Sequence, residues 1–298
     1  MLNLSVLILA AGKGVRMKSR TPKVLHTIGG VPMVERVLKS ADRLGPKRVA
    51  LVIGHESAEV KAYLAPRFPR LSFFRQKRLD GSGGAARAAS VWLKKARGEV
   101  LVLCGDAPLI RSETLAALRR AHRKEKNSVT VLSAVVPNPS GYGRIIRSGD
   151  GLVSRIAEEL DATTMERRVA EVNTGTYCFS ARALAATLPF LQNRNAKKEY
   201  YLTDLLALLR ERGLKVGAHR CADPNEALGV NSRRDLAVAQ SVLFERKANA
   251  LMEGGVTLVD PKRTYIEDDV RIGQDTVVWP DTFIQGRCRI GRGCRCRV

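Results

Sequence analysis

Residues 6–17 read Val-Leu-Ile-Leu-Ala-Ala-Gly-Lys-Gly-Val-Arg-Met, and this stretch decides the fold. The first five residues are all apolar, as in a central strand of a parallel sheet that is buried on both faces. A loop with two glycines follows. Residues 32–44 then repeat apolar side chains at helical spacing, with a proline near the start. The order strand, glycine loop, helix predicts the beginning of an α/β protein.

The same alternation continues along the chain. Short apolar runs typical of buried strands cover 49–53, 100–103 and 129–136, and helical patterns cover 81–96 and 114–122. Strands that alternate with helices favour a parallel sheet covered on both faces. We therefore expect a Rossmann-like α/β domain with a mixed, mostly parallel sheet.

After Gly229 the pattern changes. Residues 232–252 indicate one long helix that ends at Gly254-Gly255. Beyond the helix, an aliphatic residue recurs every six positions, at Ile266, Ile272, Val278, Ile284 and Ile290. This period is typical of a hexapeptide β-helix, and the chain reaches Val298 after what reads as fewer than two coils of about 18 residues. The expected division is a first domain at 1–229, a linker helix at 230–254 and the start of a left-handed β-helix at 255–298.

Length and composition limit the classes of protein. The 298 residues fit one or two domains, and 45% hydrophobic with 27% charged residues is ordinary for a globular protein. No run of 18 apolar residues predicts a membrane-spanning helix, and the apolar opening reads better as a buried strand than as a signal peptide. The six cysteines form no C-x-x-C pair, so we expect reduced thiols in a cytoplasmic protein.

The charge balance is the unusual bulk property. Lysine and arginine total 51 against 29 acidic residues, a net charge of +22. The basic residues are scattered and only 5% of the chain is aromatic, which disfavours nucleic-acid binding as the main role. A positive field also suits small phosphorylated substrates, because it steers them to a cleft.

The loop after the first strand is the first candidate site. Backbone N–H groups of a glycine loop can approach an anion closely, and Arg16 and Lys23 add two cations nearby. The loop has neither the spacing of a Walker A motif nor a complete G-x-G-x-x-G. Taken alone, it could be an ordinary turn between a strand and a helix.

The run from Leu9 to Met17 with Pro22-Lys23 resembles the signature of sugar-nucleotide pyrophosphorylases, which are nucleotidyltransferases. Further matching segments follow in order: Gln76, 81–83, 103–110, 141–144, Glu158 with 161–163, 171–175, 199–204 and 229–231. The whole series, followed by hexapeptide repeats, resembles the bacterial N-acetylglucosamine-1-phosphate uridylyltransferase family. In that family a pyrophosphorylase domain is fused to a β-helix acetyltransferase, most of which is lacking here, so we expect no acetyltransferase activity.

The resemblance implies a reaction of UTP with N-acetylglucosamine 1-phosphate that gives UDP-N-acetylglucosamine, a cell-wall and lipopolysaccharide precursor, and diphosphate. The nucleophile is a phosphate oxygen that is already ionised, so no general base is required. It also implies that Asp106 and Asn231 ligate Mg²⁺, with Arg16, Lys23 and Asp106 as the catalytic residues. Read singly, Asp106 could be a turn aspartate and Asn231 the N-cap of the long helix.

The resemblance also assigns binding residues. The nucleotide would be bound by ten positions: Leu9, Ala10, Ala11, Gly12, Lys23, Gln76, Gly81, Ser82, Cys104 and Gly105. Among these, the amide of Gln76 and the backbone at Gly81 would read uracil. The sugar would be held by hydroxyl and amide groups at Gly143, Glu158, Asn173 and Thr203.

Two departures and two rival interpretations remain open. The family usually has histidine where this chain has Gly84, and an aromatic residue where it has Cys104, which leaves the fine nucleotide preference open. The same fold could act on glucose 1-phosphate with UTP or dTTP. A non-catalytic basic protein that binds nucleic acid or assembles is the alternative of another class. Longer relatives form trimers through the β-helix, and with so few coils a homotrimer here stays open.

Overall fold

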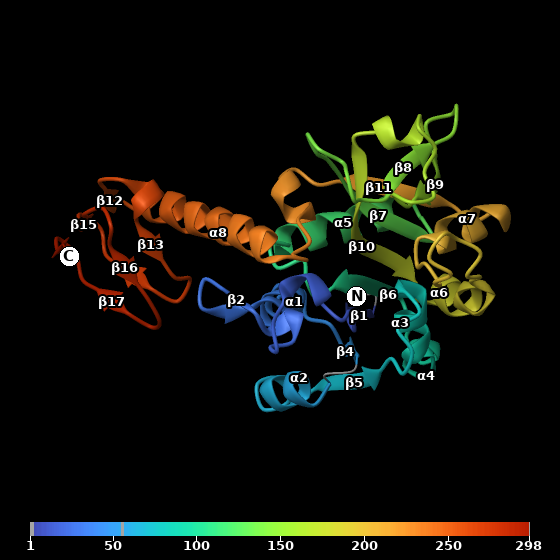
Figure 1. The fold of residues 1–298 in the computed structure, drawn as a ribbon, viewed down its shortest axis with the longest axis horizontal. Coiled ribbons are helices and arrows are strands. Elements are labelled where there is room, and N and C mark those ends of the chain that lie inside the picture. The colour runs from blue at the N-terminus through green and yellow to red at the C-terminus, as the bar shows by residue number, and fades with distance from the viewer. Residues whose placement is uncertain (1–2, 55–56, 298) are drawn as a thin grey trace.

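In the computed structural model, which describes residues 3–54 and 57–297, one mixed sheet forms the centre of the molecule (Figure 1). Its nine strands are β1 Leu4–Ala10, β4 Arg48–Ile53, β5 Leu71–Arg75, β6 Glu99–Cys104, β7 Val129–Val135, β8 Arg144–Arg147, β9 Val153–Ala157, β10 Glu171–Ser180 and β11 Val216–Arg220. The main path has the order β11-β7-β10-β6-β1-β4-β5. Every neighbouring pair on it is parallel except the two made by β10. The mixed, mostly parallel sheet is therefore confirmed.

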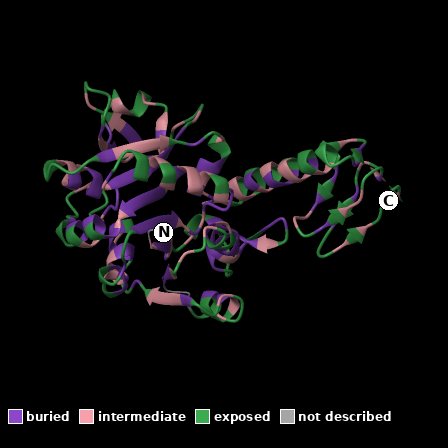
Figure 2. Ribbon diagram, turned by 180° about the vertical axis from the view of Figure 1, so that it is seen from behind, coloured by how far each residue is buried: buried purple, intermediate pink, exposed green. Residues whose placement is uncertain are grey.

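Helices cover both faces of the sheet. They are α1 Met33–Asp42, α2 Ser57–Leu64, α3 Ser82–Ala88, α4 Ser90–Lys94, α5 Ser112–Lys124, α6 Ala181–Thr187 and α7 Asp204–Glu211. One apolar cluster packs α3, α4, α6 and α7 against side chains such as Leu7 and Val102, and the other packs α1, α2 and α5 against Val6 and Leu103. Alternate residues of one strand thus point into two cores, which explains why the strands read as unbroken apolar runs. Figure 2 shows these strands as the buried centre.

The helix expected over 81–96 is two helices. α3 ends at Ala88 and α4 begins at Ser90, with Ala89 between them at φ −96° and ψ 14°, outside the helical region. The spacing of apolar residues does not reveal such a break, because the apolar residues of both helices pack into the same core: Ala85, Ala86, Trp92 and Leu93. The prediction of one continuous helix was wrong at this position.

The long helix α8, Arg233–Glu253, leads away from the sheet to the C-terminal segment (Figure 1). Ser232 caps its first turn, and its side chain accepts a hydrogen bond from the backbone of Asp235, whose carboxylate binds back to the Ser232 N–H. This capping box fixes the start of the helix. Asn231 is therefore not the N-cap.

The C-terminal segment consists of very short parallel strands. They are β12 Thr257–Leu258, β13 Tyr265–Ile266, β14 Arg271–Ile272, β15 Val277–Val278, β16 Phe283–Ile284, β17 Arg289–Ile290 and β18 Arg295–Cys296. Ile266 pairs with Ile284 and Ile272 with Ile290, so partners lie one 18-residue repeat apart. The chain passes the β12-β15-β18 face three times, which makes two circuits rather than the fewer than two expected. The aliphatic positions at six-residue spacing start at Ile266, so they do not include β12, the first strand of this face.

Several contacts attach this segment to the sheet domain. The hairpin of β2 Thr27–Ile28 and β3 Val31–Pro32 brings Gly30 against Glu267, where an added Cβ would lie 2.7 Å from the carboxyl group. Arg36 on α1 pairs with Asp268 at 2.6 Å. Lys247 on α8 donates to the carbonyls of Asp268 and Val270 at 3.0 and 2.7 Å. In the described ranges no helix is both long and apolar enough to cross a membrane.

Candidate active site

The loop after β1 is shaped by glycine at two points. Gly14 has φ +63°, and a Cβ there would lie 2.6 Å from Cβ of Lys23. At Gly54, after β4, a Cβ would lie 2.3 Å from the carbonyl oxygen of Ala11. Only glycine fits such contacts without displacing the backbone. The stem of Lys23 therefore lies directly under the loop, and its ammonium group is directed past the loop toward the end of β6.

The structure brings Lys23, Asp106 and Asn231 together. The Lys23 ammonium forms a short ion pair with Oδ2 of Asp106 and donates to Oδ1 of Asn231 at 3.1 Å. Side-chain exposure is 9% for Lys23 and 23% for Asp106, so the pair is only partly screened by water. Three segments that lie far apart in sequence thus meet at one cation-binding point.

Backbone contacts hold the two oxygen ligands in place. The carbonyl of Asp106 accepts a hydrogen bond from the N–H of Val230 at 2.8 Å, which joins the end of β6 to the residue before Asn231. The carboxylate of Asp235 accepts from the N–H of Asn231 at 3.0 Å. The capping box of α8 therefore also positions Asn231.

The donor set around the ammonium suits a hard cation. A carboxylate and an amide oxygen face one point, and Lys23 supplies the positive charge there. Within 3–54 and 57–297, no group of three or more His, Cys, Asp and Glu side chains could hold a metal ion. A metal ion at this point would take two protein oxygens and keep the rest of its shell for water or phosphate, the coordination typical of Mg²⁺.

Two cavities meet at Asp106. One of about 490 Å³ is lined by Leu9, Ala11, Gly12, Lys13, Gln76, Gly81, Ser82 and Cys104, among others. The second, of about 340 Å³, lies against Arg16, Gly143, Asn173, Gly229 and Asn231. Cys104 and Asp106 line both. The cation-binding point is therefore located between two spaces, each of the size of a small-ligand pocket.

Polar contacts prearrange the first cavity. The amide nitrogen of Gln76 donates to Oδ1 of Asp80 at 2.8 Å and to the carbonyl of Gly81 at 3.1 Å. Gly81 has φ +98°, and a Cβ there would lie 2.6 Å from the carbonyl of Tyr200. Ser82 Oγ accepts from the N–H of Leu202 at 3.0 Å, so its hydroxyl is engaged in the fold.

The structure explains the unusual Gly84. A Cβ at Gly84 would lie 1.8 Å from Oδ1 of Asp80, so the missing side chain makes room for that carboxylate. Asp80 in turn orients Gln76. Asp80 was not among the predicted site residues, although a glycine in a helix, four residues after an aspartate, was a signal for such packing.

The residues expected to hold a sugar form a second polar group beside the second cavity. Thr203 donates to Oε1 of Glu158 at 2.9 Å, and the N–H of Asn173 donates to the carbonyl of Gly143 at 2.8 Å. Gly143 and Asn173 line the cavity; Glu158 and Thr203 do not appear in its wall. An added Cβ at Gly143 would lie 3.4 Å from Glu158, so the two pairs adjoin.

Burial raises the pKa of the acidic side chains near the second cavity. Burial raises the pKa of Glu158 above its ordinary value, against the hydrogen bond from Thr203. Burial, with the carboxylates of Glu158 and Asp161 nearby, raises the pKa of Asp204 to about 6. Burial also raises the pKa of the Cys104 thiol to about 12, so this thiol is neutral at pH 7. Glu158 repels Asp204, and within residues 3–54 and 57–297 neither carboxylate has an ion pair such as that of Asp106.

The remaining residues expected at the site lie around Lys23 and Asp106, each with its own contacts. Arg16 is exposed at the wall of the second cavity. Ala10 lines a third space of about 300 Å³ with Gly12, Lys13 and Lys23. Gly105 packs behind the loop, where its N–H donates to the carbonyl of Leu9 at 2.8 Å. Lys13 was missed, although it lies inside the loop motif itself.

A mostly parallel α/β sheet, a glycine loop after its first strand and a carboxylate beyond β6 are the arrangement that a nucleotidyltransferase requires. Residues 6–198 match the family model for the MobA-like NTP transferase domain, and the chain belongs to this family.

Among known proteins, the chain is similar to bifunctional protein GlmU. It is 46% identical to that of Acetivibrio thermocellus in an alignment that covers 98% of this chain and 64% of the relative. Identity to GlmU of Halalkalibacterium halodurans is 45%, covering 99% and 64%. The chain thus spans 64% of the length of these relatives. A solved structure of UDP-glucose pyrophosphorylase complexed with UDP-glucose aligns with 83% of this chain at a TM-score of 0.66 and 17% identity, which shows a shared fold.

Proposed function

We propose that the protein is a uridylyltransferase that converts UTP and N-acetylglucosamine 1-phosphate to UDP-N-acetylglucosamine and diphosphate. The observation that carries the proposal is the convergence of Asp106 and Asn231 on one cation-binding point between two cavities. Two substrates that each carry phosphate must meet at such a point. The similarity to GlmU over nearly the whole chain supports the same reaction.

In this reaction a phosphate oxygen of the sugar attacks the α-phosphorus of UTP, the bond to the bridging oxygen breaks, and diphosphate leaves with the electron pair. Because the attacking oxygen is already ionised, no residue has to remove a proton. The main barrier is repulsion between two anions, about 4 kcal/mol for unit charges 4 Å apart at an effective dielectric constant of 20. Lys23 and Arg16 offset that repulsion and hold the phosphates in line.

We assign Mg²⁺ to Asp106 and Asn231. The ion, when bound, supplies positive charge to the phosphates at the point where the Lys23 ammonium lies in this structure. Lys23 would then be released from Asp106 to bind a phosphate oxygen. The lysine thus has two roles, neutralising the carboxylate before substrates arrive and binding phosphate afterward.

We assign uracil to Gln76 in the first cavity. Both amide hydrogens of Gln76 are already donated, to Asp80 and to Gly81. The group that the side chain can still offer a ligand is therefore Oε1, a hydrogen-bond acceptor. Uracil carries an N–H between its two carbonyl groups, whereas cytosine has no hydrogen at that position. An amide locked as an acceptor therefore favours uracil over cytosine. Thymine presents the same edge, so this contact does not separate UTP from dTTP.

We assign the sugar to Gly143, Asn173, Glu158 and Thr203. Glu158 supplies carboxylate oxygens for sugar hydroxyl groups, and Thr203 holds one of these oxygens at 2.9 Å. The amide of Asn173 donates to the Tyr177 hydroxyl at 2.8 Å and accepts from the N–H of Gly175 at 2.9 Å, which fixes its orientation.

We also propose the division into a nucleotidyltransferase domain at 1–229, a linker helix at 230–254 and the start of a left-handed β-helix at 255–298. The change from a large sheet to two-residue parallel strands supports this division. The pairing of Ile266 with Ile284 and of Ile272 with Ile290 supports a coil that repeats every 18 residues.

The test is a diphosphate-release assay with UTP, Mg²⁺ and N-acetylglucosamine 1-phosphate, each supplied or omitted. We expect release only when all three are present, and less with glucose 1-phosphate. Asp106→Asn should reduce release by about 10³-fold, because a charged carboxylate ligand becomes a neutral amide that holds the metal ion less strongly. Asp42→Asn, an exposed aspartate on α1, is the matched control and should retain activity. Full activity of Asp106→Asn would remove Asp106 from the metal site.

A further inference from the structure

A cavity outside the candidate active site lies at the junction of α1, α8 and the C-terminal segment. Its volume is about 350 Å³, and it shares no lining residue with the two cavities that meet at Asp106. Six cationic side chains line it: Arg36, Lys39, Arg43, Arg111, Arg246 and Arg271. Two carboxylates, Asp268 and Asp269, line it as well. The cations come from four separate parts of the chain, so the fold gathers them there.

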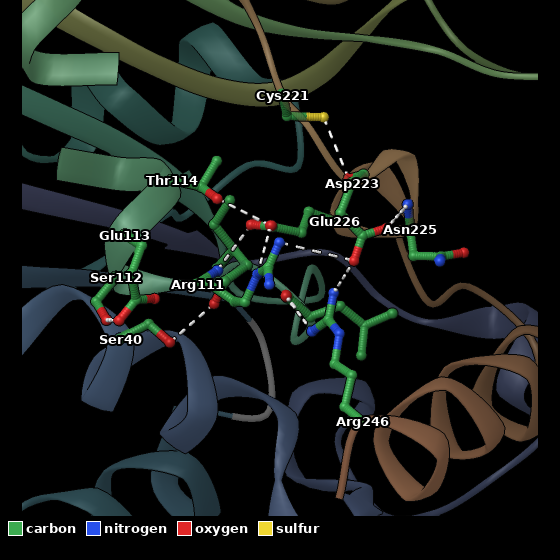
Figure 3. A network of polar contacts seen from close by, with 12 residues as sticks. Ser40, Arg111, Ser112, Glu113, Thr114, Cys221, Asp223, Asn225, Glu226 and Arg246 are labelled. Atoms are coloured by element: carbon green, nitrogen blue, oxygen red, sulfur yellow. Dashed lines mark hydrogen bonds and ion pairs between the residues drawn. The ribbon is translucent and has the colours of Figure 1, made fainter. Parts of the chain in front are cut away.

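Three of the arginines are fixed by the fold. Arg36 donates to the carbonyls of Ile28 and Gly29 and pairs with Asp268. Arg111 pairs with the buried Glu226 at 2.7 Å, and Arg246 pairs with Asp223 at 2.8 Å; Figure 3 shows this network. These pairs hold the guanidinium groups at the wall in one arrangement.

The other cations have charge to spare. For Arg43 and Arg271 the structure gives no side-chain hydrogen bond or ion pair within residues 3–54 and 57–297. Lys39 is half exposed and pairs with Glu35, one turn earlier on α1, at 2.8 Å. The lining carboxylate of Asp268 is already taken by Arg36. Each of the four cations other than Arg43 and Arg271 is balanced by its own carboxylate, and Asp269 offsets one of these two charges. The lining therefore keeps one positive charge in excess.

We propose that this cavity binds the phosphate chain of a compact polyphosphate. Guanidinium groups match phosphate oxygens in pairs, and cations entering from several elements require several anionic oxygens on the ligand. The lining contains no aromatic side chain, so a nucleobase would find no ring to stack on. We therefore assign the phosphate chain, and not a stacked nucleobase, as the group that the cavity recognises.

A short segment of chain connects the cavity to the candidate active site. Its wall includes residues 108–111, which continue directly from Asp106. Arg246 donates to the carbonyl of Leu109 at 2.9 Å, and Ser40 donates to that of Ile110 at 2.8 Å. A bound polyphosphate would contact the segment that holds Asp106, at the end remote from the substrates.

The experiment is titration of the full chain with inorganic triphosphate in EDTA, followed by calorimetry and by hydrogen-exchange mass spectrometry. Without divalent metal, binding at the candidate active site is disfavoured, so the second site is seen by itself. We expect slower exchange in 36–43 and 107–111. Arg43→Glu with Arg271→Glu should weaken binding by about tenfold or more, because two charged donors become repulsive. Exchange protection confined to 12–23 would overturn the proposal.

The matched control reverses two charges elsewhere. Arg182 on α6 and Lys94 on α4 are exposed and line none of the cavities described above. Arg182→Glu with Lys94→Glu makes the same change in net charge and should bind triphosphate as the natural chain does. Equal weakening in both double variants would assign the effect to overall charge and refute the site.

Two further arms complete the test. Arg43→Gln with Arg271→Gln removes both charges without placing carboxylates beside the phosphate, so it replaces the glutamate variant if that variant fails to fold. It should also bind triphosphate more weakly than the control does. ATP should bind no more tightly than inorganic triphosphate in EDTA. Tighter binding of ATP that is lost in the glutamine variant would assign the cavity to a nucleotide and overturn its assignment to the phosphate chain.

Discussion

Replacing Lys23 by methionine should change activity and metal affinity in opposite directions. The substitution keeps an unbranched stem under Gly14 and removes the ammonium group that contacts Asp106 and Asn231. An ammonium about 4 Å from a phosphate oxygen contributes about 4 kcal/mol at an effective dielectric constant of 20. Because 1.4 kcal/mol is a factor of ten in rate, diphosphate release should fall by about 10³-fold.

The same substitution should tighten metal binding before substrates are added. In this structure the Lys23 ammonium competes with a metal ion for the oxygens of Asp106 and Asn231, so its removal leaves the carboxylate without a cation. We expect the affinity for Mn²⁺, measured by electron paramagnetic resonance, to rise by about tenfold or more. Lys18→Met, an exposed lysine in the same loop, is the control and should change neither quantity. Weaker Mn²⁺ binding by the Lys23 variant, or undiminished release, would refute the two roles assigned to this lysine.

Three further substitutions test the structure around the site by urea unfolding. Asp204 has a folded-state pKa of about 6, above its ordinary value of 3.8. Its ionised form therefore destabilises the fold above pH 6, and this effect vanishes below pH 4. Asp204→Asn should raise the free energy of unfolding by about 1–2 kcal/mol at pH 8 and by little at pH 4. Gly175→Ala should cost about 1–3 kcal/mol, because Gly175 has φ +75° and a Cβ there would lie 2.7 Å from the sulfur of Cys104; adding Cys104→Ala should restore only part. Glu226→Gln should cost about 2–4 kcal/mol, because its buried carboxylate accepts three hydrogen bonds, whereas Glu113→Gln on the exposed start of α5 should cost under about 0.5 kcal/mol.

The sequence predicted four strands of the sheet because burial on both faces leaves a simple pattern. The apolar runs at 6–10, 49–53, 100–103 and 129–136 all correspond to central strands. The other five strands of this sheet, β5, β8, β9, β10 and β11, were not predicted; β8 and β9 in particular are short antiparallel strands of mixed polarity. The antiparallel direction of β10 was also out of reach, because strand direction depends on tertiary pairing and leaves no mark in composition.

For the site, the ordered motifs predicted which segments meet but not how they contact one another. Asp106 and Asn231 were expected to ligate Mg²⁺, which stays a prediction; the structure shows both side chains in contact with the Lys23 ammonium group. Lys23 places its charge beside Asp106 because its stem packs under Gly14. Such a contact between a side chain and the backbone leaves no repeating pattern in the sequence. The pairing of Asp80 with Gln76 was hidden for the same reason, because it depends on the space that Gly84 leaves.

The electrostatics of the site explain why the start of α8 belongs to it. A partly buried carboxylate at Asp106 is costly without a cation, and Lys23 meets that need. Replacing the ammonium by a metal ion requires ligands that stay in place while the lysine leaves. Asp106 is tied to Val230, and Asn231 is held by Asp235, so both remain fixed by backbone hydrogen bonds. In the reaction we propose, a metal ion would therefore replace the ammonium group by movement of the Lys23 side chain alone, while the start of α8 keeps Asn231 in place.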